Sequence, residues 1–143
     1  MTDRFFMTTD PDAVVPELAH PGDAGMDLRA REDGVVPARG RTLISTGLRL
    51  SLPRDCVAYV CSRSGLALNQ GVTVLNAPGV VDSGYRGEVG VILFNTTDTD
   101  YHIAAGDKVA QLIVQRVVMP AWELTKDLDD SSRGDGGFGS TGS

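Results

Sequence analysis

Residues that could build a disulfide framework or a zinc site are scarce in this sequence, which contains only two cysteines and two histidines. Cys56 and Cys61 stand five positions apart in an expected strand. An odd separation puts them on opposite faces, so we do not expect the two thiols to bond to each other. His20 and His102 have no cysteine or histidine partner at a zinc spacing. These scarcities are typical of a reduced, cytoplasmic protein and argue against a metal or triad role for either histidine.

Long apolar runs and an excess of positive charge are also missing. No run approaches the roughly 20 apolar residues that cross a bilayer, and the N-terminus does not match a signal peptide, so we expect no membrane partner. The formal net charge is −6, whereas a non-specific nucleic-acid binder needs a basic stripe, so we expect no nucleic-acid partner either. A nucleotide is not excluded, because a phosphate needs only a few local donors. Arginine supplies 11 of the 13 cationic residues, and its planar fork suits phosphate oxygens.

What the sequence does contain predicts an all-β protein. Short β-rich runs alternate with Gly, Pro, Asn and Asp, and few windows of about 11 residues keep a helical apolar period. A hydrophobic content of 41% is enough for a single core. We expect one β domain in residues 1–130, with an edge strand within 1–21, one or two strands in 42–52 and a bulge at Gly47. Residues 56–61 are apolar on both faces, which favours a central strand.

The most informative stretch is VTVLNAPGVVDSGYRGEVGVIL, residues 72–93. A β-branched run breaks at Asn-Ala-Pro-Gly, residues that turn a chain for separate reasons, and a second apolar pair then leads directly into Asp82. The pattern predicts a hairpin-like unit that presents a turn, a carboxylate, the ring of Tyr85 and an arginine. The same residues are also compatible with a surface hairpin in which Asp82 is merely solvated.

Two segments before this stretch place charged residues beside turn signals. In GDAGMDLRA, residues 22–30, a glycine-rich turn carries Asp27 into a strand, an arrangement that is also common for purely structural reasons. In SRSGLALN, residues 62–69, a strand meets a short helical stretch. There Ser64 is either a simple helix cap or, together with Arg63 and the exposed N–H groups of a helix start, part of an anion pocket.

Two further segments follow it. AGDKVAQLIV, residues 105–114, combines a turn shaped by Asp107 and Lys108 with an apolar strand, in which Gln111 is an amide that needs partners if buried. Residues 115–130 are expected to form a last strand and then an exposed linker. The tail that begins at Ser131 contains RGDGGFGSTG, and its composition alone predicts disorder.

Taken in order, these five segments resemble the five motifs of the trimeric dUTPase family of dUTP nucleotidohydrolases. The resemblance covers the chain from about Gly22 to Gly142, and five motifs in sequence are highly specific. The departures are small: Ser62 stands where the second motif begins with proline, and Met26 occupies a position that is often aromatic or β-branched. The resemblance implies a distorted jelly-roll-like β-barrel with one short helix and a mobile C-terminal lid in residues 131–143. It also implies a homotrimer in which each site draws motifs from different subunits.

The resemblance further implies a reaction and a role for each motif. Asp82 would activate the water that attacks the α-phosphorus of dUTP, releasing dUMP and pyrophosphate. Asp27 would help to hold Mg²⁺ through bound water, and Tyr85 would exclude a ribose 2′-hydroxyl. This activity limits uracil in DNA and supplies dUMP for dTMP synthesis. The implied substrate contacts are Asn76, Val80, Val81 and Gly90 at the nucleoside, and Arg63, Ser64, Gly65, Gln111, Arg133, Phe138, Gly139, Ser140 and Thr141 around the phosphates and as the lid.

Two rival functions share this scaffold. A dCTP deaminase needs a catalytic carboxylate in the strand after the central motif, and residues 89–93 contain none. A non-catalytic nucleotide sensor predicts an eroded site, whereas Asp82, Tyr85 and Gln111 are all present. For Arg86 and Glu88 we expect structural ion pairs between subunits rather than a catalytic role.

Overall fold

The computed structural model describes residues 4–139 and 142, which form ten β-strands and one short helix. The elements are β1 (Phe6–Thr9), β2 (Met26–Arg29), β3 (Gly34–Val36), β4 (Arg41–Ser51), β5 (Cys56–Cys61), α1 (Ser64–Gln70), β6 (Val72–Val74), β7 (Gly79–Val81), β8 (Glu88–Asn95), β9 (Tyr101–Ile103) and β10 (Lys108–Arg116). In this described part of the chain, no helix combines the length and apolar character needed to cross a membrane.

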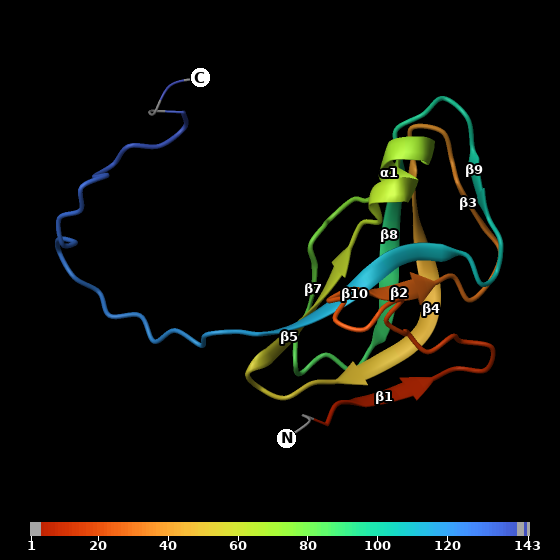
Figure 1. Cartoon of the computed structure of the whole chain (residues 1–143), viewed down its shortest axis with the longest axis horizontal. Coiled ribbons are helices and arrows are strands. Elements are labelled where there is room, and N and C mark those ends of the chain that lie inside the picture. Colours follow the sequence, from red (N-terminus) through yellow and green to blue (C-terminus); the bar gives the residue numbers. More distant parts are fainter. Residues whose placement is uncertain (1–3, 140–141, 143) are drawn as a thin grey trace.

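Two four-stranded sheets share one apolar core. Their strand orders are β1-β4-β8-β6 and β2-β10-β5-β7, and β3 pairs with β9 in a small third sheet. Figure 1 shows β10 and β2 crossing in front of β4 and β8. The core draws on both large sheets, and its largest fully buried apolar side chains are Leu28, Leu48, Leu93, Leu112, Val36, Val72, Val89, Val91 and Val109. The predicted all-β, jelly-roll-like fold is therefore confirmed.

The long strand β4 contains the predicted bulge. It pairs with β8, and the register of the ladder shifts between Ser45 and Arg49. Gly47, inside this irregularity, has a φ of +71°, a conformation that glycine adopts without steric cost. Its carbonyl accepts a hydrogen bond of 2.8 Å from the backbone N–H of Asp10. The bulge thus attaches the N-terminal segment to the main sheet.

Two further sequence predictions are confirmed. The N-terminal segment supplies the edge strand β1, which pairs with β4. Strand β5 is central, because β10 lies on one side of it and β7 on the other. Cys56, Val57, Ala58 and Val60 of this strand are buried, as expected for a strand that is covered on both faces.

The hairpin-like unit predicted for residues 72–93 is wrong in its pairing. β6 pairs with β8, where Val74 faces Leu93, whereas β7 pairs with β5, where Ala58 faces Val81. The intervening turn therefore carries the chain from one sheet to the other. Both strands contain only three residues, and a short apolar pattern specifies that a segment is buried without specifying which strand lies beside it.

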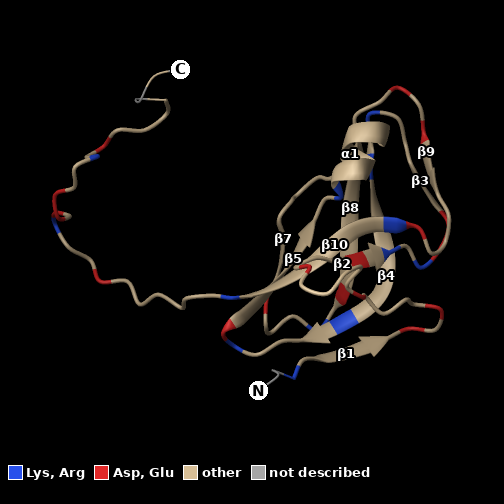
Figure 2. Cartoon of the chain, in the orientation of Figure 1, with Lys and Arg blue, Asp and Glu red and all other residues tan. Residues whose placement is uncertain are grey.

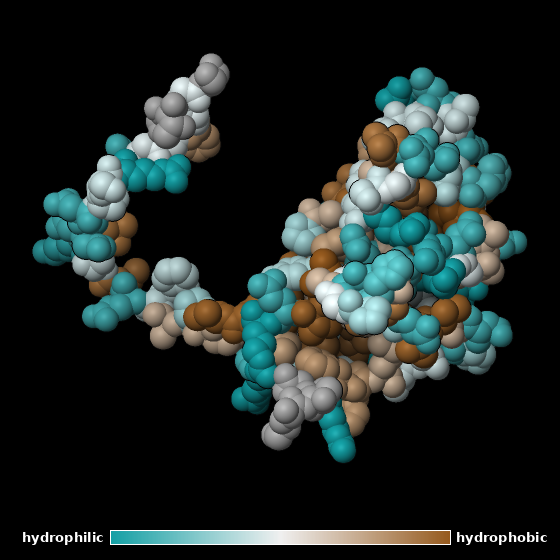
Figure 3. Space-filling view, in the orientation of Figure 1, coloured by the Kyte–Doolittle hydropathy of each residue, from teal (hydrophilic) through white to brown (hydrophobic). Residues whose placement is uncertain are grey.

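The C-terminal segment departs from the domain after β10. That strand ends at Arg116, and residues 117–139 contain no further strand, so the additional strand expected in 115–130 is not formed. Figure 1 shows this segment extending away from the sheets, and Figure 3 shows hydrophobic residues where it leaves the domain. Its large apolar side chains are largely exposed: Val118, Met119, Trp122, Leu124, Leu128 and Phe138. A strand needs a neighbour for its backbone groups. Among the described residues, the segment's backbone bonds back to the domain at its start, where the N–H of Val117 donates a 2.8 Å hydrogen bond to the carbonyl of Asp55, but no described strand pairs with it.

Substituting the bulge glycine tests how closely the N-terminal segment is packed. Gly47→Ala forces a non-glycine residue to a positive φ, which costs about 1–2 kcal/mol, and puts its Cβ 2.8 Å from the Cβ of Ala13. Gly22→Ala is the matched control, because Gly22 has a φ of +91° with nothing within 4 Å of the added Cβ. We expect Gly47→Ala to lower the free energy of unfolding by about 1–3 kcal/mol more than the control. Denaturant unfolding at one protein concentration measures this, and equal losses would contradict the packing.

Candidate functional site

The predicted site residues fall into three groups within one chain. The first surrounds Asp27, the second surrounds Asp82, and the third lies on the C-terminal segment around Phe138. Among the residues that the structure describes, no hydrogen bond or ion pair joins one group to another. Each group is therefore described by itself.

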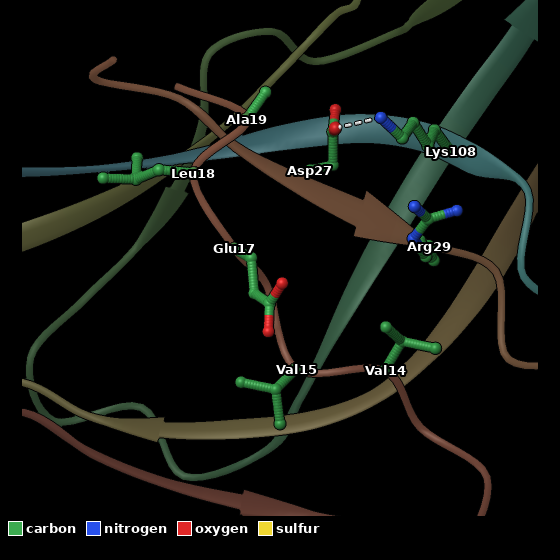
Figure 4. Close-up of a pocket in the computed structure, with 8 residues that line it drawn as sticks. All are labelled: Val14, Val15, Glu17, Leu18, Ala19, Asp27, Arg29 and Lys108. Carbon is green, nitrogen blue, oxygen red and sulfur yellow. Dashed lines mark ion pairs between the residues drawn. The ribbon is translucent and has the colours of Figure 1, made fainter. Parts of the chain in front are cut away.

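In the first group, Asp27 on β2 is held between two cations. The Nζ of Lys108, at the start of β10, lies 2.6 Å from its Oδ2, and the Nε of Arg63 lies 3.3 Å from its Oδ1. Figure 2 shows the acidic position on β2 beside the basic start of β10, and Figure 4 draws the Asp27–Lys108 ion pair. Burial raises the pKa of Asp27, but the hydrogen bond from Lys108 and the charges of Lys108, Arg63 and Arg29 outweigh it, so the pKa is below its ordinary value. Asp27 is therefore ionised at neutral pH.

A cavity of about 430 Å³ opens beside this carboxylate. Its lining combines Asp27, Lys108 and Arg29 with Glu17 and apolar side chains of the segment before β2 (Figure 4). Arg29 is fixed there, because its Nη1 donates a 2.7 Å hydrogen bond to the carbonyl of Gly106. Lys108, which the sequence pattern suggested only shapes a turn, is thus a charged member of the site. Its position in register near β2 is visible only once the strands are paired.

Gln111 is half-buried in β10 and has the partner that a buried amide needs. Its Nε2 donates a 2.9 Å hydrogen bond to the carbonyl of Ser62. The amide lies directly against Gly25, where an added Cβ would come within 2.2 Å of the Gln111 Oε1. Gly25 therefore leaves the space that this amide occupies, a requirement that its sequence context did not reveal.

The segment after β5 begins helix α1 but does not use the predicted cap. Ser64 is the first helical residue, Arg63 is the N-cap, and no side chain bonds the exposed N–H groups of the first turn. The simple-cap interpretation of Ser64 is therefore wrong by one position, because Arg63, with its extended backbone, is the last residue before the helix and Ser64 already lies within it. Ser64 and Gly65 are exposed, and nothing lies within 4 Å of a Cβ added at Gly65. This helix start is open to a ligand.

The second group lines a cavity of about 180 Å³ that contains Val80, Val81, Asp82, Tyr85, Glu88, Val89 and Gly90. Asp82 is exposed at this cavity. The Tyr85 hydroxyl donates a 3.0 Å hydrogen bond to the carbonyl of Glu88. The ring packs over Gly87, where an added Cβ would lie 2.3 Å from the hydroxyl oxygen. Tyr85 is thus a fixed wall beside the Asp82 carboxylate.

The rim of this cavity is anchored to the bulge in β4. The Glu88 carboxylate accepts hydrogen bonds from the Ser45 hydroxyl and, at 2.8 Å, from the N–H of Gly47. The Ser45 hydrogen bond is the largest of the influences that lower the pKa of Glu88 below its ordinary value. Arg86 donates to the carbonyls of Ser83 and Tyr85 at 2.7 and 3.0 Å. Both side chains therefore have partners within the chain, and ion pairs between subunits stay a prediction.

Two glycines are closely packed at this cavity: Gly90, which lines it, and Gly79, which precedes its lining residue Val80. An added Cβ at Gly90 would lie 2.6 Å from Cδ1 of Leu43, so this leucine covers the glycine from β4. An added Cβ at Gly79 would lie 3.2 Å from Nδ2 of Asn76, which places that exposed amide beside the start of β7. Leu43 carried no signal in the sequence, because only the pairing of β4 with β8 brings it to Gly90.

The third group lies on the C-terminal segment. Arg133 turns back on its own chain, where its Nε donates a 2.8 Å hydrogen bond to the carbonyl of Gly136. Phe138 and Gly139 are exposed, and the segment runs away from the domain (Figure 1). Ser140 and Thr141 lie outside the described residues. Within one chain, the described residues of this group approach neither cavity (Figure 1).

The ion pairs of Asp27 predict a specific acid response. Because its folded pKa is depressed, the pairs stabilise the fold fully above the unfolded value near 3.8 and lose this contribution as the pH falls through the lower, folded value. The stability difference between the wild type and Asp27→Asn should therefore be constant from pH 5 to 7 and shrink below about pH 4. Urea unfolding across this range measures it. A difference that grows on acidification would contradict the pairing.

The chain matches known proteins over almost its whole length. A sequence model of the dUTPase family matches residues 12–142. The deoxyuridine 5′-triphosphate nucleotidohydrolase of Rhodococcus erythropolis is 49% identical over 134 residues, covering 93% of this chain and 82% of that protein. The corresponding protein of Cutibacterium acnes is 45% identical and covers 99% of this chain and 94% of its own, and that of Arabidopsis thaliana is 48% identical and covers 91% and 77%.

Solved structures show the same fold. The dUTPase of Staphylococcus bacteriophage 80alpha, in complex with dUpNHpp, has a TM-score of 0.92 at 25% identity, covering 99% of this chain and 100% of that one. A variant dUTPase of phage phi11 of S. aureus, described with a structural Mg(II) ion, has a TM-score of 0.81 at 24% identity, covering 87% and 98%. With the family model matched from residue 12 to 142 and relatives identical at nearly half of the aligned positions, this chain belongs to the dUTPase family.

Proposed function

We propose that this chain hydrolyses dUTP to dUMP and pyrophosphate, limiting uracil in DNA and supplying dUMP for dTMP synthesis. The observation that carries the proposal is the cavity beside β7, which Asp82 lines together with Val80, Val81 and Tyr85, whose hydroxyl is held by the Glu88 carbonyl. Membership of a family whose relatives are named deoxyuridine 5′-triphosphate nucleotidohydrolases supports it.

The backbone of β7 is our proposed reader of uracil. β7 is the last strand of its sheet in the described part of the chain, so one edge of Val80 and Val81 has no described strand beside it. Uracil presents an acceptor, a donor and an acceptor along its pairing edge, and the N–H and C=O groups of an unpaired strand edge can complement that order. Cytosine would leave buried groups without partners, which gives strong discrimination. Asn76 and Gly90 would complete the slot around the nucleoside.

Asp82 is the proposed catalytic residue. Its carboxylate would accept a proton from, or orient, a water that attacks the α-phosphorus in line with the departing pyrophosphate. Tyr85 would occupy the space of a ribose 2′-hydroxyl, and its hydrogen bond to the Glu88 carbonyl supports this by keeping the ring from turning aside. A rigid wall excludes an extra hydroxyl more effectively than a mobile one, because the mobile wall can yield.

The proposed phosphate site is the first group together with the C-terminal lid. Arg63, Gln111 and the open helix start at Ser64 and Gly65 would bind the phosphate chain, and electrostatic stabilisation of this kind is usually the largest contribution to such catalysis. The lid would bring Arg133 to the phosphates and place Phe138 on uracil, with Gly139, Ser140 and Thr141 around the terminal phosphate. Closure would exclude water from the reacting groups.

Mg²⁺ is the proposed cofactor, held on the triphosphate with Asp27 reaching it through water. One carboxylate suits this role, because Mg²⁺ retains several waters and needs few protein oxygens when phosphates supply the others. Among the described residues there is no group of three or more acidic, histidine or cysteine side chains that could hold a metal alone. When bound, the ion would neutralise charge on the phosphates.

A homotrimer is the proposed working form. The three groups of site residues lie apart within one chain, so a complete site requires contributions from more than one copy. Exposing many neighbouring apolar side chains to water is unfavourable, and such a surface often marks an interface. The C-terminal segment exposes several of them: Val118, Met119, Trp122, Leu124 and Leu128. We propose that this segment packs on a neighbouring copy and delivers its lid to that copy's site.

Replacing the proposed base tests the mechanism. Asp82→Asn removes the carboxylate charge at constant size, so we expect pyrophosphate release from dUTP to fall by about 10²- to 10⁴-fold while the Kd for dUpNHpp changes little. Asp12→Asn is the matched control, because Asp12 is exposed, lines neither cavity, and is held at a positive φ that asparagine tolerates. The wild type should release pyrophosphate from dUTP but not from dCTP, dTTP or UTP. A wild-type rate in Asp82→Asn would contradict the proposal.

Removing the lid tests the proposed division at residue 130. In the described part of residues 131–139, the hydrogen bonds of the segment are all internal to it, so a chain ending at Asp130 should unfold at the same temperature as the full chain. Its activity on dUTP should fall by at least tenfold, because Arg133 and Phe138 are gone. Thermal unfolding and pyrophosphate release on the two chains measure this. A truncated chain with full activity would show that the lid is dispensable.

A further inference from the structure

The Asp27 carboxylate has both oxygens engaged before any ligand arrives. Lys108 Nζ is 2.6 Å from Oδ2, and Arg63 Nε is 3.3 Å from Oδ1. The side chain of Asp27 is only 22% exposed, and those of Lys108 and Arg63 are 36% and 34% exposed. Water therefore screens these charges less than it would on an open surface. The proposed metal-side residue is thus already neutralised by its own chain.

A divalent cation meets two obstacles at such a carboxylate. A hydrated Mg²⁺ donates hydrogen bonds from its waters to carboxylate oxygens, and the two cationic side chains occupy positions that those waters would take. The positive charges of Lys108 and Arg63 also repel the ion directly. In the chain without a ligand, Asp27 is therefore a poor site for Mg²⁺.

Lys108 and Arg63 differ in how firmly they are held. Arg63 is tied twice, since its Nη1 also donates a 3.3 Å hydrogen bond to the carbonyl of Lys108. The ammonium of Lys108 ends a flexible four-carbon stem, and its described partner is Asp27 alone. The backbone of Lys108 is fixed by its place in the β2–β10 ladder, beside buried Val109, so only the side chain can swing. Its cavity, lined also by Arg29 and Glu17, leaves space for that movement (Figure 4).

We propose that Lys108 is a positioning residue that controls the order of binding: it occupies Asp27 until a triphosphate draws its ammonium away, so that Mg²⁺ reaches Asp27 only together with the nucleotide. The triphosphate supplies several anionic oxygens, which compete for the lysine and bring the metal that replaces it. This inference rests on the proposed function for the identity of the ligand. Its central contact, between Lys108 and Asp27, belongs to the chain without ligand and can be tested there.

The test measures metal binding without turnover. Mn²⁺, an EPR-visible substitute for Mg²⁺, is titrated into the full-length wild type and into Lys108→Met, with the free Mn²⁺ signal as the readout. Lys126→Met is the matched control, because Lys126 is the other lysine of the chain and lies exposed on the C-terminal segment. Without nucleotide we expect Lys108→Met to bind Mn²⁺ at least fivefold more tightly than the wild type, and Lys126→Met to match the wild type.

Two further arms make the result specific. The gain should vanish in the double variant Asp27→Asn with Lys108→Met, and saturating dUpNHpp should bring the wild type and Lys108→Met within twofold of each other. Lys108→Gln, which keeps a polar side chain, replaces the methionine variant if circular dichroism shows a disturbed fold. Equal Mn²⁺ affinity of wild type and Lys108 variant, or a gain that survives loss of Asp27, would overturn the inference. Failure to release pyrophosphate from dUTP would instead overturn the proposed function. The Mn²⁺ titration without nucleotide would still test the role of Lys108.

Discussion

The pairing of β5 with β10 on one side and β7 on the other is the constraint on which the first two groups of site residues, around Asp27 and around Asp82, depend. Across one ladder Cys61 faces Gln111, and across the other Ala58 faces Val81, the residue that precedes Asp82. Arg63 is the second residue after the end of the same strand. One buried strand thus sets the position of the residues around Asp27 and of the candidate catalytic carboxylate. A shift of its register by one residue would turn both sets of side chains to the opposite face.

Close approach at glycine is the second recurring device. Gly25 leaves the space of the Gln111 amide, Gly87 lies under the Tyr85 ring, and Gly90 lies under Leu43. In each place a methyl group would overlap the neighbour, at distances from 2.2 to 2.6 Å. These glycines therefore position side chains through the volume that they leave empty. Hydrogen bonds to Ser62 and Glu88 then hold the Gln111 and Tyr85 groups in that volume.

The sequence predicted local features well and pairings less well. The bulge at Gly47, the edge strand β1 and the central position of β5 follow from glycine chemistry and from apolar pattern, and the structure confirms them. The predicted pairing across residues 72–93 is wrong, because β6 and β7 belong to different sheets. The ion pair of Lys108 with Asp27 was missed for a related reason. These residues are 81 positions apart, and nothing in the neighbourhood of either indicates the other.

The sequence by itself determined the β class, the central strand at residues 56–61 and the chemical groups at hand: a carboxylate after an apolar pair, arginines suited to phosphate, and a glycine-rich tail. Those features depend on local composition and periodicity, which any stretch carries without its neighbours. Only the tertiary structure decided that Lys108 and Arg63 neutralise Asp27, that Glu88 is anchored on Ser45 and Gly47, and that the site residues lie in separate groups. Such arrangements depend on strand pairing and on the register of each pair. The pairing that forms is the one that minimises the free energy of the whole chain rather than of any one segment.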